Sequence, residues 1–155
     1  DGFGLTLLRE AGLELAIITG RQSAIVQARA AELRIAHVRQ GVQDKAGELL
    51  ALCGQLGLQP RQAGFMGDDW PDLPAMAVAG LALAPADAAR PVRERADWVA
   101  TRGGGRGAVR EFAEWGLAQR GLLEPMLQRY LTRKPAASAG PADSGGAALP
   151  PSWSA

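Results

Sequence analysis

The sequence predicts an α/β fold in which a parallel β-sheet is covered by helices on both faces. Short apolar runs alternate along the chain with segments whose apolar residues recur at helical spacing, a pattern typical of strands joined by covering helices. Polar residues, often beside a glycine, follow several of the apolar runs. The chain has 155 residues, 47% of them hydrophobic, which is enough for one domain with a core.

The first half of the chain predicts three helices and two strands. A helical pattern begins directly after Asp1, and the apolar run 13–19 is of strand length and ends at a glycine. Apolar residues at helical spacing predict a helix at 23–33, and a short strand is expected at 37–40. The helical pattern of 45–57 ends on glycine, a common helix stop.

The second half continues the alternation. The run 63–67 reads as a buried strand that stops at a group of carboxylates. Further strands are expected at 81–84 and 97–101, and helices at 72–79, 86–96, 107–120 and 122–131. In open parallel sheets, ligands bind beyond the carboxyl ends of the strands, so these ends are the places to look for a site.

Composition divides the chain and excludes some functions. Residues 1–132 are expected to form the core, and residues 133–155, rich in Ala, Pro, Gly and Ser, a flexible tail. The formal net charge of +1 gives no support for binding nucleic acid or a membrane surface, and no apolar stretch is long enough to span a membrane. The single cysteine, Cys53, fits a reducing cytoplasm.

The strongest candidate site is the segment Gly67-Asp68-Asp69-Trp70-Pro71-Asp72. It places three carboxylates after a predicted strand, and close carboxylates repel one another unless a cation holds them together. Oxygen ligands of this kind suit Mg²⁺, which proteins often share with phosphate. The alternative is that Asp68 and Asp69 are turn residues and Asp72 caps a helix.

Other strand ends carry groups suited to a phosphate. Thr19, Gly20 and Arg21 combine a hydroxyl, a flexible backbone and a guanidinium, and such groups bind phosphoryl or carboxylate oxygens. Lys45 opens a predicted helix and would neutralise a phosphoryl group. The segment 103–107 contains four glycines and suits either an anion-binding loop or a flexible joint. An ordinary turn or surface lysine is the alternative in each case.

Thr19, Lys45 and the Asp68–Asp72 cluster, in this order, resemble motifs II, III and IV of the haloacid-dehalogenase superfamily, whose fold is Rossmann-like. Longer segments are similar to the small capless 3-deoxy-D-manno-octulosonate 8-phosphate phosphatases: Asp1-Gly2-Phe3-Gly4, residues 16–21, residues 67–76 and residues 104–111. The likeness covers about residues 1–120. It implies a magnesium-dependent, homotetrameric hydrolase that acts in lipopolysaccharide biosynthesis.

The resemblance also implies roles for the candidate residues. Asp68 would be a magnesium ligand, and Asp69 and Asp72 would support the metal and Lys45. Thr19 would bind the transferred phosphoryl group, which Lys45 would neutralise.

Two further roles concern the substrate. Arg21, beside Gly20, would line the substrate entrance. Arg106 would contact the active site of a neighbouring subunit.

One motif of the superfamily has no counterpart in the sequence. Motif I, an Asp-x-Asp on the first, central strand, supplies the nucleophile and a general acid/base, and no Asp-x-Asp occurs in the chain. We therefore expect an N-terminally truncated, inactive fragment with a gap in the sheet beside the strand that ends at Thr19. The alternatives are a phosphatase of a nine-carbon sialic-type sugar acid phosphate and a catalytically dead module for oligomerisation.

Overall fold

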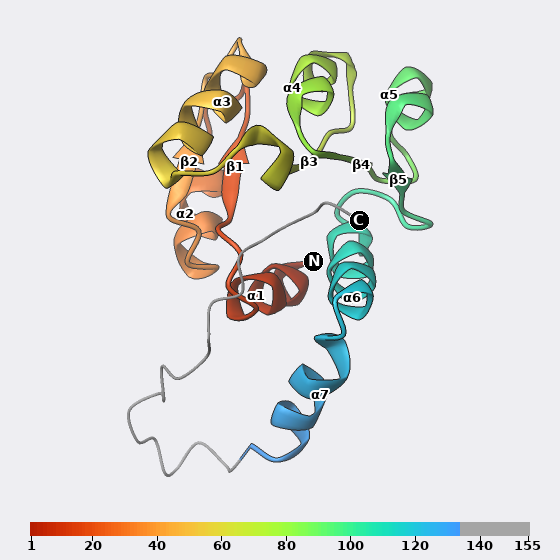
Figure 1. Cartoon of the computed structure of the whole chain (residues 1–155). Coiled ribbons are helices and arrows are strands. Elements are labelled where there is room, and N and C mark those ends of the chain that lie inside the picture. The colour runs from red at the N-terminus through yellow and green to blue at the C-terminus, as the bar shows by residue number, and fades with distance from the viewer. Residues whose placement is uncertain (134–155) are drawn as a thin grey trace.

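Strands in two separate sheets form the centre of the computed structural model, which describes residues 1–133 (Figure 1). All pairings are parallel, as predicted. One sheet has the order β1-β2 and the other the order β3-β4-β5. The strands are β1 (Ala16–Ile18), β2 (His37–Arg39), β3 (Gly64–Met66), β4 (Leu81–Ala84) and β5 (Trp98–Val99).

Every helix expected from the sequence is present. The α-helices are α1 (Gly2–Glu10), α2 (Ala24–Glu32), α3 (Lys45–Leu56), α4 (Leu73–Val78), α5 (Arg90–Arg95), α6 (Ala108–Gln119) and α7 (Leu123–Leu131), and two short 3₁₀ helices are η1 (Pro60–Gln62) and η2 (Trp70–Asp72). The largest difference concerns α5, which was expected to begin at residue 86. Residues 86–89 instead form a turn, because the N–H of Ala88 donates to the carbonyl of Pro85 and that of Ala89 to the carbonyl of Asp68.

The central strand β4 separates two hydrophobic cores. Ala82 and Ala84 face the core built with α3, α4 and α5, whereas Leu83 faces the core built with α1, α6 and α7. This alternation follows from the two-residue period of a strand. Figure 1 shows the same layers, with α4 and α5 on one side of β3-β4-β5 and α1 and α6 on the other. The predicted α/β fold with helices on both faces is confirmed.

The ends of α3 are defined by local chemistry. Asp44 Oδ1 accepts the N–H of Gly47 at 2.9 Å and so caps the amino end of the helix. Gly57 ends the helix with φ +68°, in the left-handed region that favours glycine. Lys45 is therefore the first residue of α3, held at the carboxyl side of the sheet.

The expected gap in the sheet is present between β1 and β3. Within residues 1–133, β1 pairs only with β2 and β3 pairs only with β4. The two strands do not pair with each other. Each of the two strands therefore has one edge without a strand partner among these residues. The part of the chain that the structure describes also contains no helix long and apolar enough to cross a membrane. The predicted tail lies outside the described residues, apart from Arg133 at its start.

Candidate active site at the carboxyl ends of the strands

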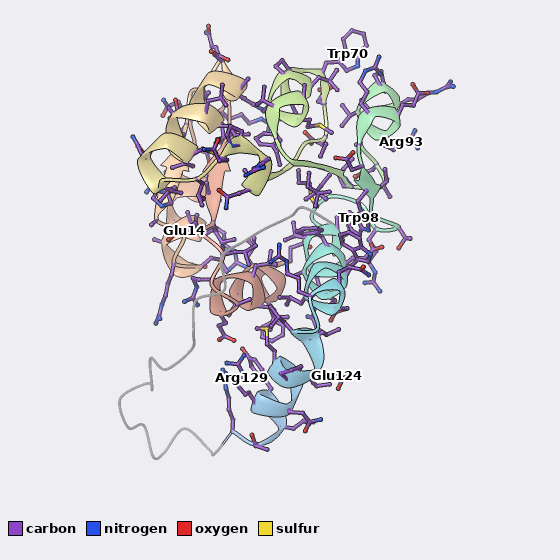
Figure 2. The ribbon with its side chains drawn as sticks, in the orientation of Figure 1. Glu14, Trp70, Arg93, Trp98, Glu124 and Arg129 are labelled. Atoms are coloured by element: carbon purple, nitrogen blue, oxygen red, sulfur yellow. The ribbon has the colours of Figure 1, made fainter. Side chains whose placement is uncertain are left out.

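The aspartate segment lies where β3 ends. The N–H of Gly67 still donates to Leu83 at 3.0 Å, so the strand pairing continues up to the residue before Asp68. The chain then turns into η2 and α4 (Figure 2). A Cβ on Gly67 would lie 2.5 Å from the Cβ of Asp72 and 2.9 Å from the Sδ of Met76. Glycine is therefore required here for Asp72 to fold back over the end of the strand.

Asp72 is the buried centre of the site. Its Oδ1 lies 2.6 Å from Lys45 Nζ, and the side chains of the two residues are 7% and 14% exposed. Its Oδ2 accepts the N–H groups of Asp68 at 2.9 Å and Asp69 at 3.2 Å. Burial alone would raise the pKa of Asp72, but the hydrogen bonds from Lys45 and these two N–H groups outweigh burial and lower it. Asp72 is therefore an ionised carboxylate that orients both the lysine and the turn.

Asp69 behaves as a turn residue, which is the alternative that the sequence left open beside a metal site. Its Oδ1 accepts the N–H of Trp70 at 2.8 Å and its side chain caps η2. Asp72, in contrast, makes no side-chain cap to α4. Asp72 is therefore no side-chain cap of α4: its carboxylate binds Lys45 and forms the capping box of η2 together with Asp69.

Asp68 is exposed as a residue and lies at the end of β3, with its carboxyl partly desolvated beside that of Asp72. Its carboxyl pKa is raised by burial and then by the hydrogen bond and negative charge of Asp72. Residues 1–133 contain no group of three or more side chains able to hold a metal together, so the three aspartates do not form a closed cage. Mg²⁺ is usually bound by one or two carboxylates with waters and phosphate oxygens. Asp68 fits such an open site, with Asp69 beside it.

Thr19, Gly20 and Arg21 lie at the carboxyl end of β1. Thr19 Oγ1 accepts the N–H of Arg21 at 3.2 Å, and the backbone of Thr19 is held by Arg39 and Val42. Among the described residues, no hydrogen bond or ion pair joins Thr19 or Arg21 to the aspartate turn. The structure thus brings Lys45, Asp68, Asp69 and Asp72 together and places the Thr19 turn across the gap from them.

The glycine-rich segment 103–107 follows β5 and does not form an open anion-binding loop. The N–H of Gly104 donates to Asp87 at 2.8 Å, and the N–H of Gly107 donates to Asp1 at 3.3 Å. Arg106 lies on this loop, with its N–H donating to the carbonyl of Gly103 at 3.1 Å. Asp87 is an isolated carboxylate that carries no motif, and Asp1 belongs to a segment that matches the family but was given no role of its own.

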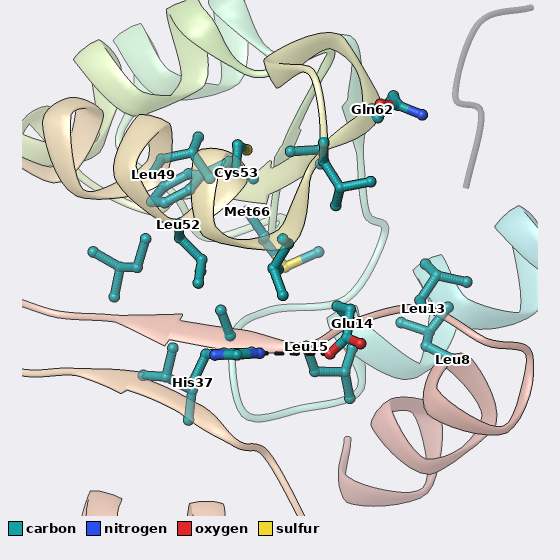
Figure 3. Close-up of a pocket in the computed structure, with 18 of the residues that line it drawn as sticks. Leu8, Leu13, Glu14, Leu15, His37, Leu49, Leu52, Cys53, Gln62 and Met66 are labelled. Atoms are coloured by element: carbon teal, nitrogen blue, oxygen red, sulfur yellow. Dashed lines mark ion pairs between the residues drawn. The ribbon is translucent and has the colours of Figure 1, made fainter. Parts of the chain in front are cut away.

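The gap between β1 and β3 forms a cavity of about 420 Å³. Its lining is mostly apolar and comes from both strand edges and from α1, α3 and α6 (Figure 3). His37 and Glu14 lie close together in this lining, with His37 Nε2 3.5 Å from Glu14 Oε2. We call this cavity the slot; β1 with the preceding Leu15 bounds one side of it, and β3 with the preceding Ala63 bounds the other.

Comparison with known proteins identifies the family. A 3-deoxy-D-manno-octulosonate 8-phosphate phosphatase from Moraxella catarrhalis, solved with a magnesium ion, a phosphate ion and KDO, is 39% identical. It superimposes with a TM-score of 0.81, over 84% of this chain and 75% of that protein. The chain belongs to the 3-deoxy-D-manno-octulosonate 8-phosphate phosphatase family.

Other relatives agree. A phosphatase of the same name from Escherichia coli K12 is 40% identical over 124 residues, which are 80% of this chain and 66% of the relative. The chain thus spans just under two thirds of the curated relatives it matches. A putative HAD superfamily (subfamily III A) hydrolase from Legionella pneumophila is 41% identical, with a TM-score of 0.80 over 86% of this chain and 73% of the other. No protein-family model matches the chain.

Proposed function

We propose that residues 1–133 form the metal-holding part of a magnesium-dependent phosphomonoesterase. The reaction is hydrolysis of 3-deoxy-D-manno-octulosonate 8-phosphate to the free sugar acid and phosphate. The observation that carries the proposal is the pair Lys45–Asp72, 2.6 Å apart and buried beside Asp68. A buried ammonium beside an acidic turn at the carboxyl ends of parallel strands suits a doubly charged phosphoryl group and a divalent cation. The magnesium, phosphate and KDO bound in the Moraxella relative support the same chemistry.

Each candidate residue then has one task. Asp68 binds Mg²⁺ with Asp69 as a neighbour, and the metal supplies charge neutralisation at the phosphoryl oxygens. Asp72 holds the ammonium of Lys45 by their 2.6 Å contact and directs it at the phosphoryl group. On the far side of the slot, Thr19 and the backbone of Gly20 bind a phosphoryl oxygen, and Arg21 contacts the sugar acid.

The slot is where we place the nucleophile. Its two strand edges need backbone partners, and an extended strand would supply them to both edges at once. Such a strand, parallel to β1 and β3, would end between the Thr19 turn and Asp68. A carboxylate at that end would attack phosphorus as the bond to the sugar oxygen breaks, and a second carboxyl group, in its neutral acid form, would give its proton to the leaving oxygen and become a carboxylate. Water would then release phosphate from the aspartyl-phosphate.

Phosphate release from purified protein tests the proposal. We expect none from the 155-residue chain alone, and release with Mg²⁺ once an apolar strand with Asp-x-Asp at its carboxyl end is fused before Asp1. The matched control is the same fusion with Asn in place of the first Asp, which we expect to be inactive. Turnover by the unmodified chain, free of contaminating phosphatases, would contradict this assignment of the nucleophile.

Substrate and assembly are tested separately. We expect the fusion to prefer the eight-carbon sugar acid phosphate to its nine-carbon sialic-type counterpart, and the reverse preference would change the substrate. The resemblance to the family supports a homotetramer in the cytoplasm. Light scattering during size-exclusion chromatography would measure the assembly state. If the chain forms a tetramer without Mg²⁺, and the strand fusion has no phosphatase activity, the role of an oligomerisation module would be favoured.

A further inference from the structure

The turn that carries Thr19 and Arg21 is held by the segment at the end of β2. The N–H of Thr19 donates to the carbonyl of Arg39 at 2.9 Å, and the carbonyl of Thr19 accepts the N–H of Val42 at 3.0 Å. The N–H of Gly41 donates to the carbonyl of Arg21, also at 3.0 Å. Backbone hydrogen bonds therefore fix the start and the middle of this turn.

The far end of the turn depends on one side chain, that of Gln40. Gln40 Oε1 accepts the N–H of Ser23 at 2.6 Å, and Gln40 Nε2 donates to Gln27 Oε1 at 3.3 Å. A backbone N–H can only donate, so the oxygen of the Gln40 amide must face Ser23. Ser23 is the N-cap of α2, and its own hydroxyl accepts the N–H of Val26. Gln40 thus ties the end of the turn, and with it the start of α2, to the end of β2.

The Thr19 hydroxyl is arranged to donate a hydrogen bond. Thr19 Oγ1 accepts the N–H of Arg21 at 3.2 Å, and this is the one hydrogen bond of the hydroxyl among residues 1–133. A hydroxyl has one proton as well as its lone pairs, so the proton is left for an acceptor such as a phosphoryl oxygen. Arg21 lies only two residues before Ser23. A turn released at Ser23 would therefore hold the Arg21 N–H less firmly against the hydroxyl.

We propose that Gln40 is a positioning residue for phosphate binding. By holding the N–H of Ser23, it keeps the turn closed against Thr19. The Arg21 N–H then stays on Thr19 Oγ1, and the hydroxyl proton is directed at a phosphoryl oxygen. This inference rests on the proposed function, in which Thr19 binds the phosphoryl group. Gln40 acts through the turn and takes no part in the chemical step.

The test uses the full 155-residue chain with inorganic phosphate and Mg²⁺ as the probe. Phosphate affinity is measured by NMR titration, and closure of the turn by hydrogen exchange of the Arg21 and Ser23 amides. Gln40→Ala removes the acceptor of Ser23. The matched control is Gln55→Ala, because Gln55 Oε1 also accepts a hydrogen bond from the end of β2, that of Arg39 Nη2 at 3.1 Å, but lies on α3.

A double-mutant cycle with Thr19→Val tests whether Gln40 acts through the hydroxyl. Thr19→Val removes the hydroxyl and should itself weaken phosphate binding about fivefold. If Gln40 only directs this hydroxyl, Gln40→Ala should cause no further loss of phosphate affinity in the Thr19→Val variant. Additive losses would show that Gln40 acts on binding by another route and would overturn the inference.

We expect Gln40→Ala alone to speed exchange of both amides and to weaken phosphate binding about fivefold. Gln55→Ala should change neither, even where it lowers the melting temperature. Unchanged affinity in Gln40→Ala, or an equal loss in the Gln55 control, would contradict the role given to Gln40. Absence of phosphate binding by the unaltered chain would instead count against the proposed role of Thr19. Amide exchange would then still decide whether Gln40 holds the turn, and rates unchanged by Gln40→Ala would show that it does not.

Discussion

Lys45 Nζ lies 2.6 Å from Asp72 Oδ1, although 26 residues separate them along the chain. Both side chains are largely buried, so neither charge is well solvated without the other. The pair links the start of α3 to the turn after β3. It therefore joins the stability of the fold to the charge balance of the site.

Replacing Lys45 with Ala should destabilise the chain and abolish phosphatase activity in the strand fusion. Loss of the ammonium leaves Asp72 buried without its countercharge, at a cost of about 3 kcal/mol in the free energy of unfolding. Urea denaturation would measure this cost. The control is Arg39→Ala, because the Arg39–Glu48 pair is about one third exposed at both side chains and should contribute less than about 1 kcal/mol. Equal losses in the two variants would contradict the role given to Lys45.

Gly67→Ala should destabilise the chain by about 2 kcal/mol, because its Cβ would collide with Asp72 and Met76. The matched substitution is Gly54→Ala within α3, where a Cβ meets nothing within 4 Å. That change should stabilise the chain by about 0.5–1 kcal/mol, since Ala favours helix more than Gly. Chemical denaturation of both variants measures the difference, and the same sign for both would show that Asp72 does not need the space above Gly67.

Asp68→Asn should remove the response of the chain to Mg²⁺. Without the metal, the variant should melt at or above the temperature of the unaltered chain, because a negative charge beside Asp72 is lost. With Mg²⁺, the unaltered chain should melt at a higher temperature, by ligand linkage, whereas the variant should not respond. Thermal melts with and without Mg²⁺ give both comparisons. An undiminished magnesium shift in the variant would place the metal elsewhere.

Protonation of Glu111 should lower the free energy of unfolding in acid. Burial would raise its pKa, but hydrogen bonds from Thr101 and the N–H of Arg102 outweigh burial and lower it. A carboxyl whose folded pKa lies below its unfolded value of 4.5 stabilises the fold fully above that value. This contribution is lost as the pH falls through the folded pKa. Unfolding measured from pH 7 downward should show a shallower loss for Glu111→Gln, and identical slopes would contradict the prediction.

Much of the secondary structure followed from local pattern. The helix at 45–57 appears as α3, ending at Gly57, because glycine readily adopts the left-handed conformation that closes a helix. The predicted start of α5, residue 86, was four residues too early, because the helix begins at Arg90. Residues 86–89 have no helix-breaking feature within themselves, and their turn depends on a hydrogen bond to Asp68 from another part of the chain.

The site was also predicted only in part, because local pattern reveals neighbouring residues but not contacts between distant parts of the chain. Three aspartates in one segment were visible as a cluster, and the resemblance to the family gave Asp72 its role beside Lys45. Asp1 lies in a segment that resembles the family, but its contacts could not be predicted, because its partners at Gly107, Val109 and Arg110 are more than 100 residues away.

The sequence by itself determined the α/β class, the order of helices and strands and the cluster from Gly67 to Asp72, because each depends on composition, periodicity or neighbouring residues. The family followed from the resemblance of short segments to a known family. Tertiary structure alone decided which aspartate oxygen binds Lys45, that the N–H groups of Gly104 and Gly107 donate to carboxylates, and that β1 and β3 border an apolar slot. These features depend on contacts between residues distant in the chain. Only the folded packing of α1, α3 and α6 around the strands brings those groups within hydrogen-bonding distance.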